Sequence, residues 1–205
     1  MGEYISKTFE LPLERARSLQ LAYYRQFGTT LAGLMQIHKL PPEPFLEYVY
    51  DIDVSGILES PQLAAAIARL PGRRLIFTNG SRRHAESIIN RLGISELFDG
   101  ICDIAALDYV PKPARTAYDR LLKLHAITAP RAAIFEDLPH NLEIAHALGM
   151  TTVLVCPDKM DHPARVKIDD WHNLPPYIDH MTGELVTFLN SETISPKRAV
   201  CAPSN

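Results

Sequence analysis

Three short segments of the chain carry side chains that could together bind a phosphoryl group. Thr78 follows an apolar run and begins the sequence Thr-Asn-Gly-Ser. Lys112 lies between two prolines, and Glu136 and Asp137 follow a second apolar run. A hydroxyl, an ammonium and metal-binding carboxylates are the groups that stabilise a phosphoryl group during transfer. These residue types predict phosphate chemistry, with Thr78 and Lys112 as its catalytic groups.

The turn after Thr78 is expected to complete a phosphate site. Asn79 and Gly80 stand between a predicted strand and a predicted helix, and backbone N–H groups at a helix N-terminus bind anions. An ordinary N-capped turn from strand to helix is the alternative. With the lysine included, we expect phosphate to be bound by Thr78, Asn79, Gly80 and Lys112.

The acidic pair predicts a metal site. Two carboxylates at the end of a buried strand repel each other unless a cation or a base lies between them, and hard oxygen ligands suit Mg²⁺. Asn141 follows one helical turn later. An acidic N-cap for the next helix is the alternative. We expect Asp137 and Glu136 to hold Mg²⁺, which would be the cofactor.

The elements that must position these segments alternate between strands and helices. Apolar runs predict strands over residues 74–78, 132–135 and 151–155. Helices are expected over residues 61–70, 84–92, 142–148 and about 183–189. Strands that are apolar throughout, each followed by a helix, favour a parallel sheet covered on both faces. Ligands bind beyond the carboxyl ends of such strands. The predicted fold is therefore a doubly wound α/β fold.

The segment before residue 60 differs from the rest because its apolar residues recur at helical spacing, as Leu13, Ala16, Leu19 and Tyr23 do. The last residues are polar, contain proline and lack periodicity. We therefore predict three parts: a helical segment over 1–58, an α/β core over 59–190 and a disordered tail over 191–205.

The composition argues against a disordered chain and against a membrane-spanning protein. The chain has 205 residues, of which 46% are hydrophobic, and a formal net charge of -3. A disordered chain has fewer apolar residues, and a membrane-spanning helix needs about 18 uninterrupted ones. No cluster of Lys and Arg predicts a nucleic-acid or membrane partner. The three cysteines form no C-x-x-C motif, so we expect a reduced, cytoplasmic protein.

The ordered motifs resemble those of the haloacid dehalogenase-like (HAD) hydrolase superfamily, and in particular its pyrimidine 5′-nucleotidase branch. They are Ile-Phe-Thr-Asn-Gly-Ser at 76–81, Lys-Pro at 112–113 and Phe-Glu-Asp-Leu at 135–138. The resemblance covers nearly the whole chain to about residue 190. It implies a Rossmann-like core with a small helical cap, formed here by the helical segment. It also implies Mg²⁺-dependent hydrolysis of a small-molecule phosphomonoester, a nucleoside monophosphate.

The resemblance assigns roles to individual residues. Thr78 would hydrogen-bond the phosphoryl oxygens, and Lys112 would neutralise the nucleophile and the phosphate. Asp137 would bind Mg²⁺ with Glu136 beside it.

The resemblance further implies a D-x-D-x-[TV] motif at the end of the central strand, upstream of the cap. Its first Asp would form an aspartyl-phosphate, and its second would protonate the leaving group. Because Met1 falls within the expected cap, we expect the chain to be N-terminally truncated, without its first core strand, and inactive as written. Two explanations are left open: the start codon is misassigned, or the N-terminal motif has truly been lost. The alternative function is a non-catalytic HAD remnant that binds phosphate or metal.

Asp51 and Asp53 match part of that motif. A strand ending at Asp51 could form a βαβ unit with the next predicted strand. However, Glu47 would then lie inside a sheet buried on both faces, and Phe45 and Val49 have helical spacing. We expect these residues to link cap and core, with Asp51 as nucleophile the alternative.

Overall fold

A computed structural model describes residues 1–156 and 174–191. The described residues form two compact units, and the chain passes between them more than once. The first unit comprises Met1–Ala64 and Pro71–Lys112, and the second comprises Ala65–Leu70 and the described residues from Pro113 onward. Helix α5 (Pro61–Ala68) contributes residues to both units.

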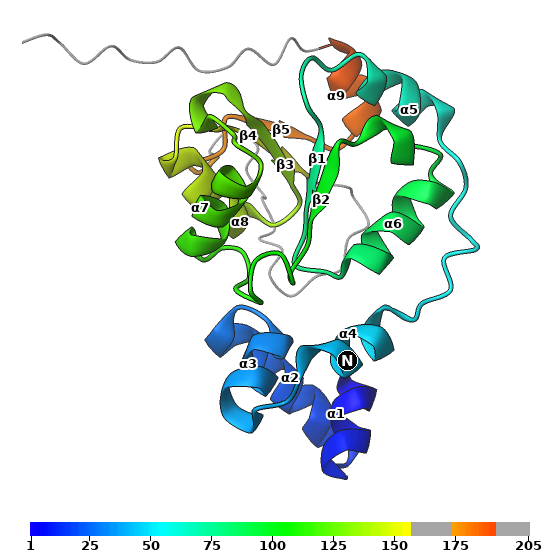
Figure 1. Ribbon diagram of the computed structural model, residues 1–205, viewed down its shortest axis with the longest axis vertical. Helices are drawn as coiled ribbons and strands as arrows, with labels where there is room; N and C mark the ends of the chain where they lie inside the picture. Colours follow the sequence, from blue (N-terminus) through cyan, green and yellow to red (C-terminus); the bar gives the residue numbers. More distant parts are fainter. Residues whose placement is uncertain (157–173, 192–205) are drawn as a thin grey trace, which may run out of the picture. The chain divides into compact units, whose positions relative to one another are not determined.

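Four helices open the first unit (Figure 1), as the periodicity predicts. They are α1 (Gly2–Phe9), α2 (Leu13–Phe27), α3 (Thr30–His38) and α4 (Pro42–Tyr50). Gly28 ends α2 with a φ of 80°, which is a left-handed conformation that glycine adopts readily. Thr29 begins α3, since its hydroxyl accepts the N–H of Ala32 at 3.1 Å.

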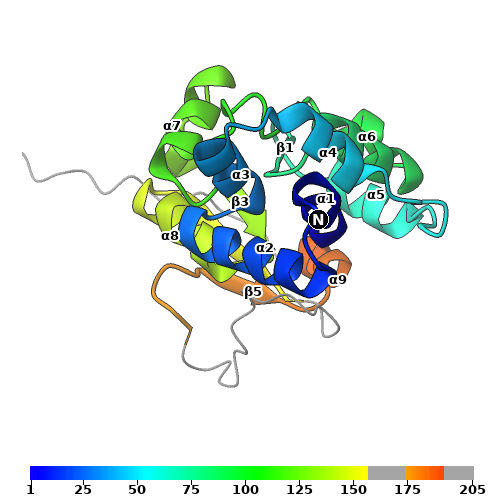
Figure 2. The same cartoon turned by 90° about the horizontal axis from the view of Figure 1, so that it is seen from below.

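The four helices enclose an apolar core of their own. Helix α1 packs on α2, α2 packs on α3, and α4 contacts both α1 and α3 (Figure 2). The fully buried side chains include Ile5 and Leu34, and Phe45 of α4 packs among them. Ile104, which lies far along the chain, belongs to the same core. This contact explains why the helical segment forms one unit with residues 71–112.

A small parallel sheet completes the first unit. Strand β1 (Leu75–Phe77) pairs with β2 (Gly100–Cys102), so that Ile76 lies opposite Ile101. Helix α6 (Arg82–Arg91) and the 3-10 turn η1 (Ser95–Leu97) connect the two strands. Because the strands are parallel, their carboxyl ends lie at the same edge of the sheet, where Thr78 and Asp103 follow them.

The second unit contains a three-stranded parallel sheet with the order β3-β4-β5. The strands are β3 (Ala133–Glu136), β4 (Thr151–Val155) and β5 (His180–Thr182). Its helices are α7 (Arg115–Leu124), α8 (Pro139–Ala147) and α9 (Leu185–Ser191), and the 3-10 turn η2 (Ala129–Arg131) precedes β3. Helix α8 packs on β3 and β4, and the Phe188 ring of α9 meets the Phe135 ring of β3 edge-on.

The predicted α/β class with parallel strands is confirmed, but the described strands form two sheets instead of one. The prediction missed β2 and β5, since neither is a run of consecutive apolar residues as β1 is. Ser191, which was predicted to begin a disordered tail, is the last residue of α9, and residues 192–205 lie outside the described part. The compact units differ from the predicted division at residue 58, which stays a prediction.

None of the helices in the described ranges has both the length and the apolar character needed to cross a membrane.

Candidate phosphate site

Thr78 lies where the sequence predicts it, directly after β1. Its N–H donates to the carbonyl of Cys102 at 3.0 Å, which holds the backbone against the end of β2. Its hydroxyl oxygen accepts the N–H of Gly80 at 2.9 Å. A threonine hydroxyl has one proton of its own and can still donate it after accepting a bond. Thr78 can therefore donate to an anion at the carboxyl end of β1.

Asn79 holds Lys112 at this edge of the sheet through a pair of hydrogen bonds. The Asn79 amide donates to the Lys112 carbonyl at 3.1 Å, and its Oδ1 accepts the Lys112 N–H at 2.8 Å. Both bonds join residues that are 33 positions apart in the sequence. Asn79, which was predicted to bind phosphate, thus uses its amide group to position the lysine.

Lys112 is a buried residue, only 8% exposed, and its ammonium lies beside β1. Its Nζ donates to the carbonyl of Phe77 at 3.1 Å and lies 4.9 Å from the centre of the Phe77 ring. Because Phe77 directly precedes Thr78, the ammonium and the threonine backbone share the end of one strand. A positively charged ammonium at this position would attract an anion.

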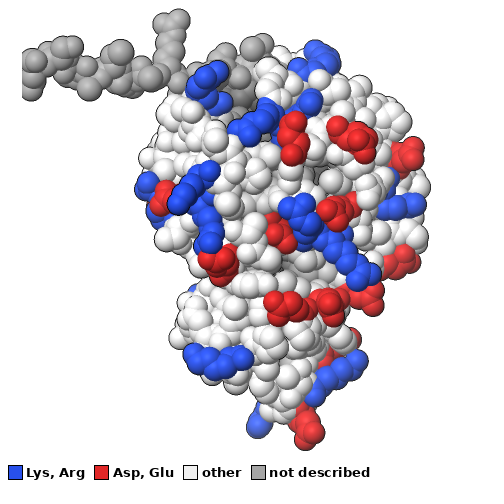
Figure 3. Space-filling model, viewed as in Figure 1, with Lys and Arg blue, Asp and Glu red and all other residues white. Residues whose placement is uncertain are grey.

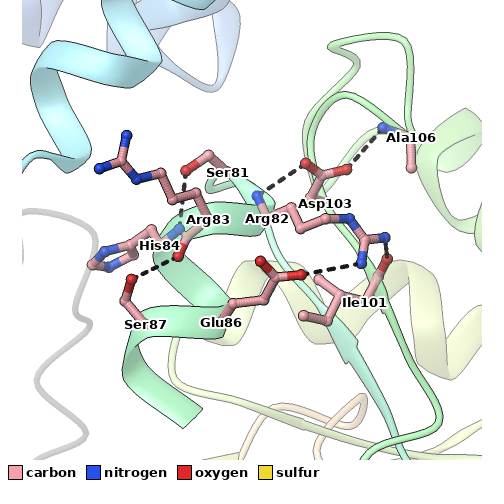
Figure 4. A network of polar contacts seen from close by, with 9 residues as sticks. All are labelled: Ser81, Arg82, Arg83, His84, Glu86, Ser87, Ile101, Asp103 and Ala106. Carbon is pink, nitrogen blue, oxygen red and sulfur yellow. Dashed lines mark hydrogen bonds and ion pairs between the residues drawn. The ribbon is translucent and has the colours of Figure 1, made fainter. Parts of the chain in front are cut away.

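The amides at the start of α6 are bound by protein groups instead of being available to phosphate. Ser81 caps the helix by accepting the His84 N–H at 3.3 Å, and Asp103 accepts the Arg82 N–H at 3.0 Å. The other Asp103 oxygen accepts the Ala106 N–H at 3.0 Å (Figure 4). These three N–H groups are therefore used as in an N-capped turn, and the binding of phosphate at this turn stays a prediction.

Gly80 also fails as a backbone donor. Its N–H is bound to Thr78 and its carbonyl accepts the Ile104 N–H at 3.1 Å. Its contribution lies instead in its lack of a side chain. A Cβ built on Gly80 would lie 3.2 Å from Thr78 Oγ1 and 3.1 Å from the hydroxyl of Tyr50, closer than most real Cβ contacts. The glycine therefore leaves space between two hydroxyl groups.

Sequence reasoning assigned no role to Asp103, a buried carboxylate that follows β2. Its negative charge stabilises the N-terminus of α6, where the backbone N–H groups carry partial positive charge. The Arg82 side chain lies nearby, with one guanidinium nitrogen 2.6 Å from the Ile101 carbonyl and another 3.6 Å from Glu86 (Figure 4). Since β2 was not predicted, the position of Asp103 at a strand end could not be recognised.

The predicted metal ligands belong to the second unit, at the end of β3. Glu136 is 7% exposed, and its Oε1 accepts the N–H of Asp137 at 3.2 Å and that of Leu138 at 3.3 Å. Tyr118 is buried nearby, and its hydroxyl donates to the Asn141 carbonyl. Burial, and secondarily the Glu136 charge, raises the pKa of Tyr118 well above its ordinary value, so it remains a hydrogen-bond donor.

The donor types in this segment fit Mg²⁺. Asn141 Oδ1 is buried and has no hydrogen-bond partner among the residues that the structure describes, so it could accept a bond from water or contact a cation. Among residues 1–156 and 174–191, no three His, Cys, Asp or Glu side chains gather as a metal cluster. However, Mg²⁺ commonly binds one or two carboxylates and completes its shell with water and phosphate oxygens. Two carboxylates and an amide oxygen therefore suffice chemically.

The Asp51–Asp53 segment is a linker in the structure. Residues Pro42–Tyr50 form helix α4, and Asp51 caps its C-terminus, so no strand ends there. Both aspartates are exposed. The Asp53 carboxylate accepts the Ser55 N–H at 2.8 Å, and this bond lowers the pKa of Asp53. The structure thus agrees with the helical spacing, and the role of this segment as a link between cap and core stays a prediction.

The structure brings part of the predicted site together. Thr78, Asn79, Gly80 and Lys112 meet in the first unit, whereas Glu136 and Asp137 belong to the second. On the face drawn in Figure 3, basic and acidic side chains are interspersed. Selectivity for an anion would therefore come from local groups such as Lys112.

Comparison with known proteins supports the resemblance over the segment that carries these motifs. Residues 69–155 match a family model described as haloacid dehalogenase-like hydrolase. Among solved structures, the chain resembles L-2-haloacid dehalogenase from Xanthobacter autotrophicus, with 17% identity, a TM-score of 0.53, and coverage of 86% of this chain and 84% of that chain. It also resembles HAD phosphatase from Thermococcus onnurineus, with 14% identity, a TM-score of 0.56, and coverage of 92% and 84%. At these identities, the structural likeness shows the fold alone.

Proposed function

We propose that this chain is a hydrolase of the haloacid dehalogenase-like superfamily, and that its site binds a phosphomonoester. The observation that carries the proposal is that the Thr78 hydroxyl and the Lys112 ammonium both lie at the end of β1, the first bound by the Gly80 N–H and the second bound to the Phe77 carbonyl. A hydroxyl donor and a cation stabilise the negative oxygens of a phosphoryl group. The family match over residues 69–155 includes both groups.

The substrate class we propose is a nucleoside 5′-monophosphate, as in the pyrimidine 5′-nucleotidase branch. The support is the sequence resemblance in the motifs around Thr78, Lys112 and Asp137. Solved structures with the same fold include both dehalogenases and a phosphatase, so the fold does not choose between them. A comparison of UMP with 2-chloropropionate as ligands therefore tests the substrate class directly.

Mg²⁺ is proposed as the cofactor, with Asp137 and Glu136 as the residues that would hold it. When bound, it would neutralise charge on the phosphoryl oxygens. The Glu136 carboxylate is oriented by the backbone N–H groups of Asp137 and Leu138, which fixes one of its oxygens. Asp137, the next residue, is half-buried at the end of β3. Lys112 would remain the protein's own cation for the phosphate.

We further propose that residues 1–205 bind the phosphoryl group without hydrolysing it. The sequence contains one D-x-D pair, Asp51 and Asp53, and both lie exposed in the linker after α4. An aspartyl-phosphate mechanism needs a carboxylate held at the phosphorus. The non-catalytic remnant that binds phosphate or metal is the alternative reading of the same site, and binding experiments test what both readings share.

Calorimetry of the purified chain with inorganic phosphate and with UMP, each with and without Mg²⁺, tests the binding site. We expect binding of both ligands. Thr78→Val, which removes the hydroxyl and keeps the side-chain shape, should weaken binding about tenfold. Thr8→Val, on the exposed surface of α1, is the matched control and should bind as the original chain does. Failure to bind phosphate or UMP, or tighter binding of 2-chloropropionate, contradicts the proposal.

Turnover is measured separately with UMP and p-nitrophenyl phosphate. We expect no Mg²⁺-dependent release of phosphate. Hydrolysis that Asp51→Asn abolishes would identify Asp51 as the nucleophile and contradict the proposed lack of turnover.

A further inference from the structure

The phenol of Tyr50 lies against the turn that follows β1. A Cβ built on Gly80 would be 3.1 Å from Tyr50 Oη and 3.3 Å from Tyr50 Cζ, as well as 3.2 Å from Thr78 Oγ1. Both hydroxyls therefore lie close to the Gly80 Cα, beside a small space that a methyl group would overfill. Gly80 does not have a positive φ. Its backbone conformation does not require glycine, so what distinguishes this position is space.

His84 holds the Tyr50 ring in this position. The centres of the two rings are 4.7 Å apart, and their planes differ by 30°, which is a stacked arrangement. His84 lies in the first turn of α6, where Ser81 binds its backbone N–H, and its ring points away from Asp103 (Figure 4). Burial lowers the pKa of His84, so the stacked imidazole is neutral at pH 7. The ring contact restrains the phenol beside Gly80.

The Tyr50 hydroxyl keeps a proton that it can donate. Burial raises the pKa of Tyr50, so the phenol is protonated at neutral pH. Within the described ranges of the chain, its hydroxyl has no protein hydrogen-bond partner. Tyr50 is half-buried and its oxygen is not fully enclosed by the described residues. Water or a ligand oxygen can therefore accept its proton.

We propose that Tyr50 is a phosphate-binding residue whose O–H donates to an oxygen of the phosphoryl group bound by Thr78 and Lys112. This inference rests on the proposed function. A protonated phenol and a threonine hydroxyl beside the same space supply two donors, and a phosphoryl group offers several acceptor oxygens. The end of α4, which belongs to the helical segment, thereby contributes directly to the site.

Calorimetry with inorganic phosphate tests the role of the hydroxyl. Tyr50→Phe removes only the oxygen and retains the stacked ring, so we expect a folded protein that binds phosphate about tenfold more weakly. The matched control is Tyr48→Phe. Tyr48 lies on the same helix, and its hydroxyl accepts from Lys7 at 3.0 Å and donates to Glu3 at 3.4 Å. The control should bind phosphate with unchanged affinity.

A second variant tests the space itself. Gly80→Ala places a methyl group between the two hydroxyls, so we expect a loss of phosphate affinity at least as large as that of Tyr50→Phe. Circular dichroism and urea unfolding would verify that both variants are folded. If Thr78→Val weakens binding while Tyr50→Phe binds normally, the role of Tyr50 is overturned and the proposed function stands. If the original chain binds no phosphate, the proposed function fails and the role of Tyr50 fails with it.

Discussion

The side-chain amide of Asn79 binds both backbone polar groups of Lys112, accepting its N–H and donating to its carbonyl. The Asn79 amide group carries its donor and its acceptor in one plane, so it can bind the Lys112 carbonyl and N–H together. These two bonds fix the lysine backbone relative to β1. Pro111 and Pro113 restrict the backbone on either side. The backbone of this lysine is thus positioned by a residue that the sequence assigned to the phosphate itself.

Loss of the Asn79 amide should therefore affect both stability and binding. Asn79→Ala leaves the Lys112 N–H and carbonyl without their partners, so we expect the free energy of unfolding to fall by about 1–3 kcal/mol. Phosphate binding should weaken as well. Urea unfolding and calorimetry measure the two effects. Asn90→Ala, on the exposed surface of α6, is the control and should change neither. Normal phosphate affinity in folded Asn79→Ala would show that the pair does not position the lysine.

Removal of the Lys112 charge should weaken anion binding more than it affects the fold. Lys112→Met keeps a long apolar stem next to the Phe77 ring but removes the cation. We expect phosphate affinity to fall at least about tenfold, because bonds from a charged donor are stronger than neutral ones. Lys123→Met, exposed on α7, is the charge-matched control. Equal phosphate affinity in the two variants would argue against a role for the Lys112 ammonium.

Asp103 should stabilise the protein through helix α6. Asp103→Asn keeps the size of the side chain but removes both the charge and one of the two acceptor oxygens, so we expect a loss of about 0.5–2 kcal/mol in urea unfolding. The control Glu96→Gln removes an exposed charge from η1 in the same unit. Should Asp103→Asn prove as stable as the original chain, the carboxylate charge would have no capping role.

The neutral His84 predicts a dependence of stability on pH. Because burial lowers its pKa in the folded protein from the ordinary 6.5, the unfolded chain binds this proton first as pH falls. The stability that neutral His84 contributes is present in full above pH 6.5. It is lost as the pH falls below that value, because protons then bind preferentially to the unfolded chain. We expect the urea midpoint to fall between pH 7.5 and 5.5, and to fall less in His84→Gln. Parallel pH profiles for the two proteins would contradict this.

The sequence predicts the parts of the site that depend on local patterns. The apolar run before Thr78 places the threonine at a strand end, and helical spacing in Phe45 and Val49 identifies α4. The family motifs identify Lys112 as important. None of these patterns reveals that Asn79 binds Lys112, because that contact joins residues 33 positions apart and depends on the path of the intervening chain.

Two further parts of the site could not be predicted for different reasons. Strand β2 has the sequence Gly-Ile-Cys, which lacks the apolar run that identifies β1, so Asp103 was not placed beside α6. Tyr50 lies 30 positions before Gly80. Its proximity results from the packing of the helical segment around Ile104, a tertiary contact without a local signature.

The path of the chain between the two compact units determines how the protein can be divided. The backbone leaves the first unit at Ala64, returns at Pro71 and leaves again after Lys112. A single cleavage therefore cannot release either unit intact. A fragment that ends at Lys112 would retain Ala65–Leu70 without the residues they pack with, and the complementary fragment would lack that same piece. Lys112 is also the last residue before the final crossing, so a cut there would free the backbone that Asn79 holds.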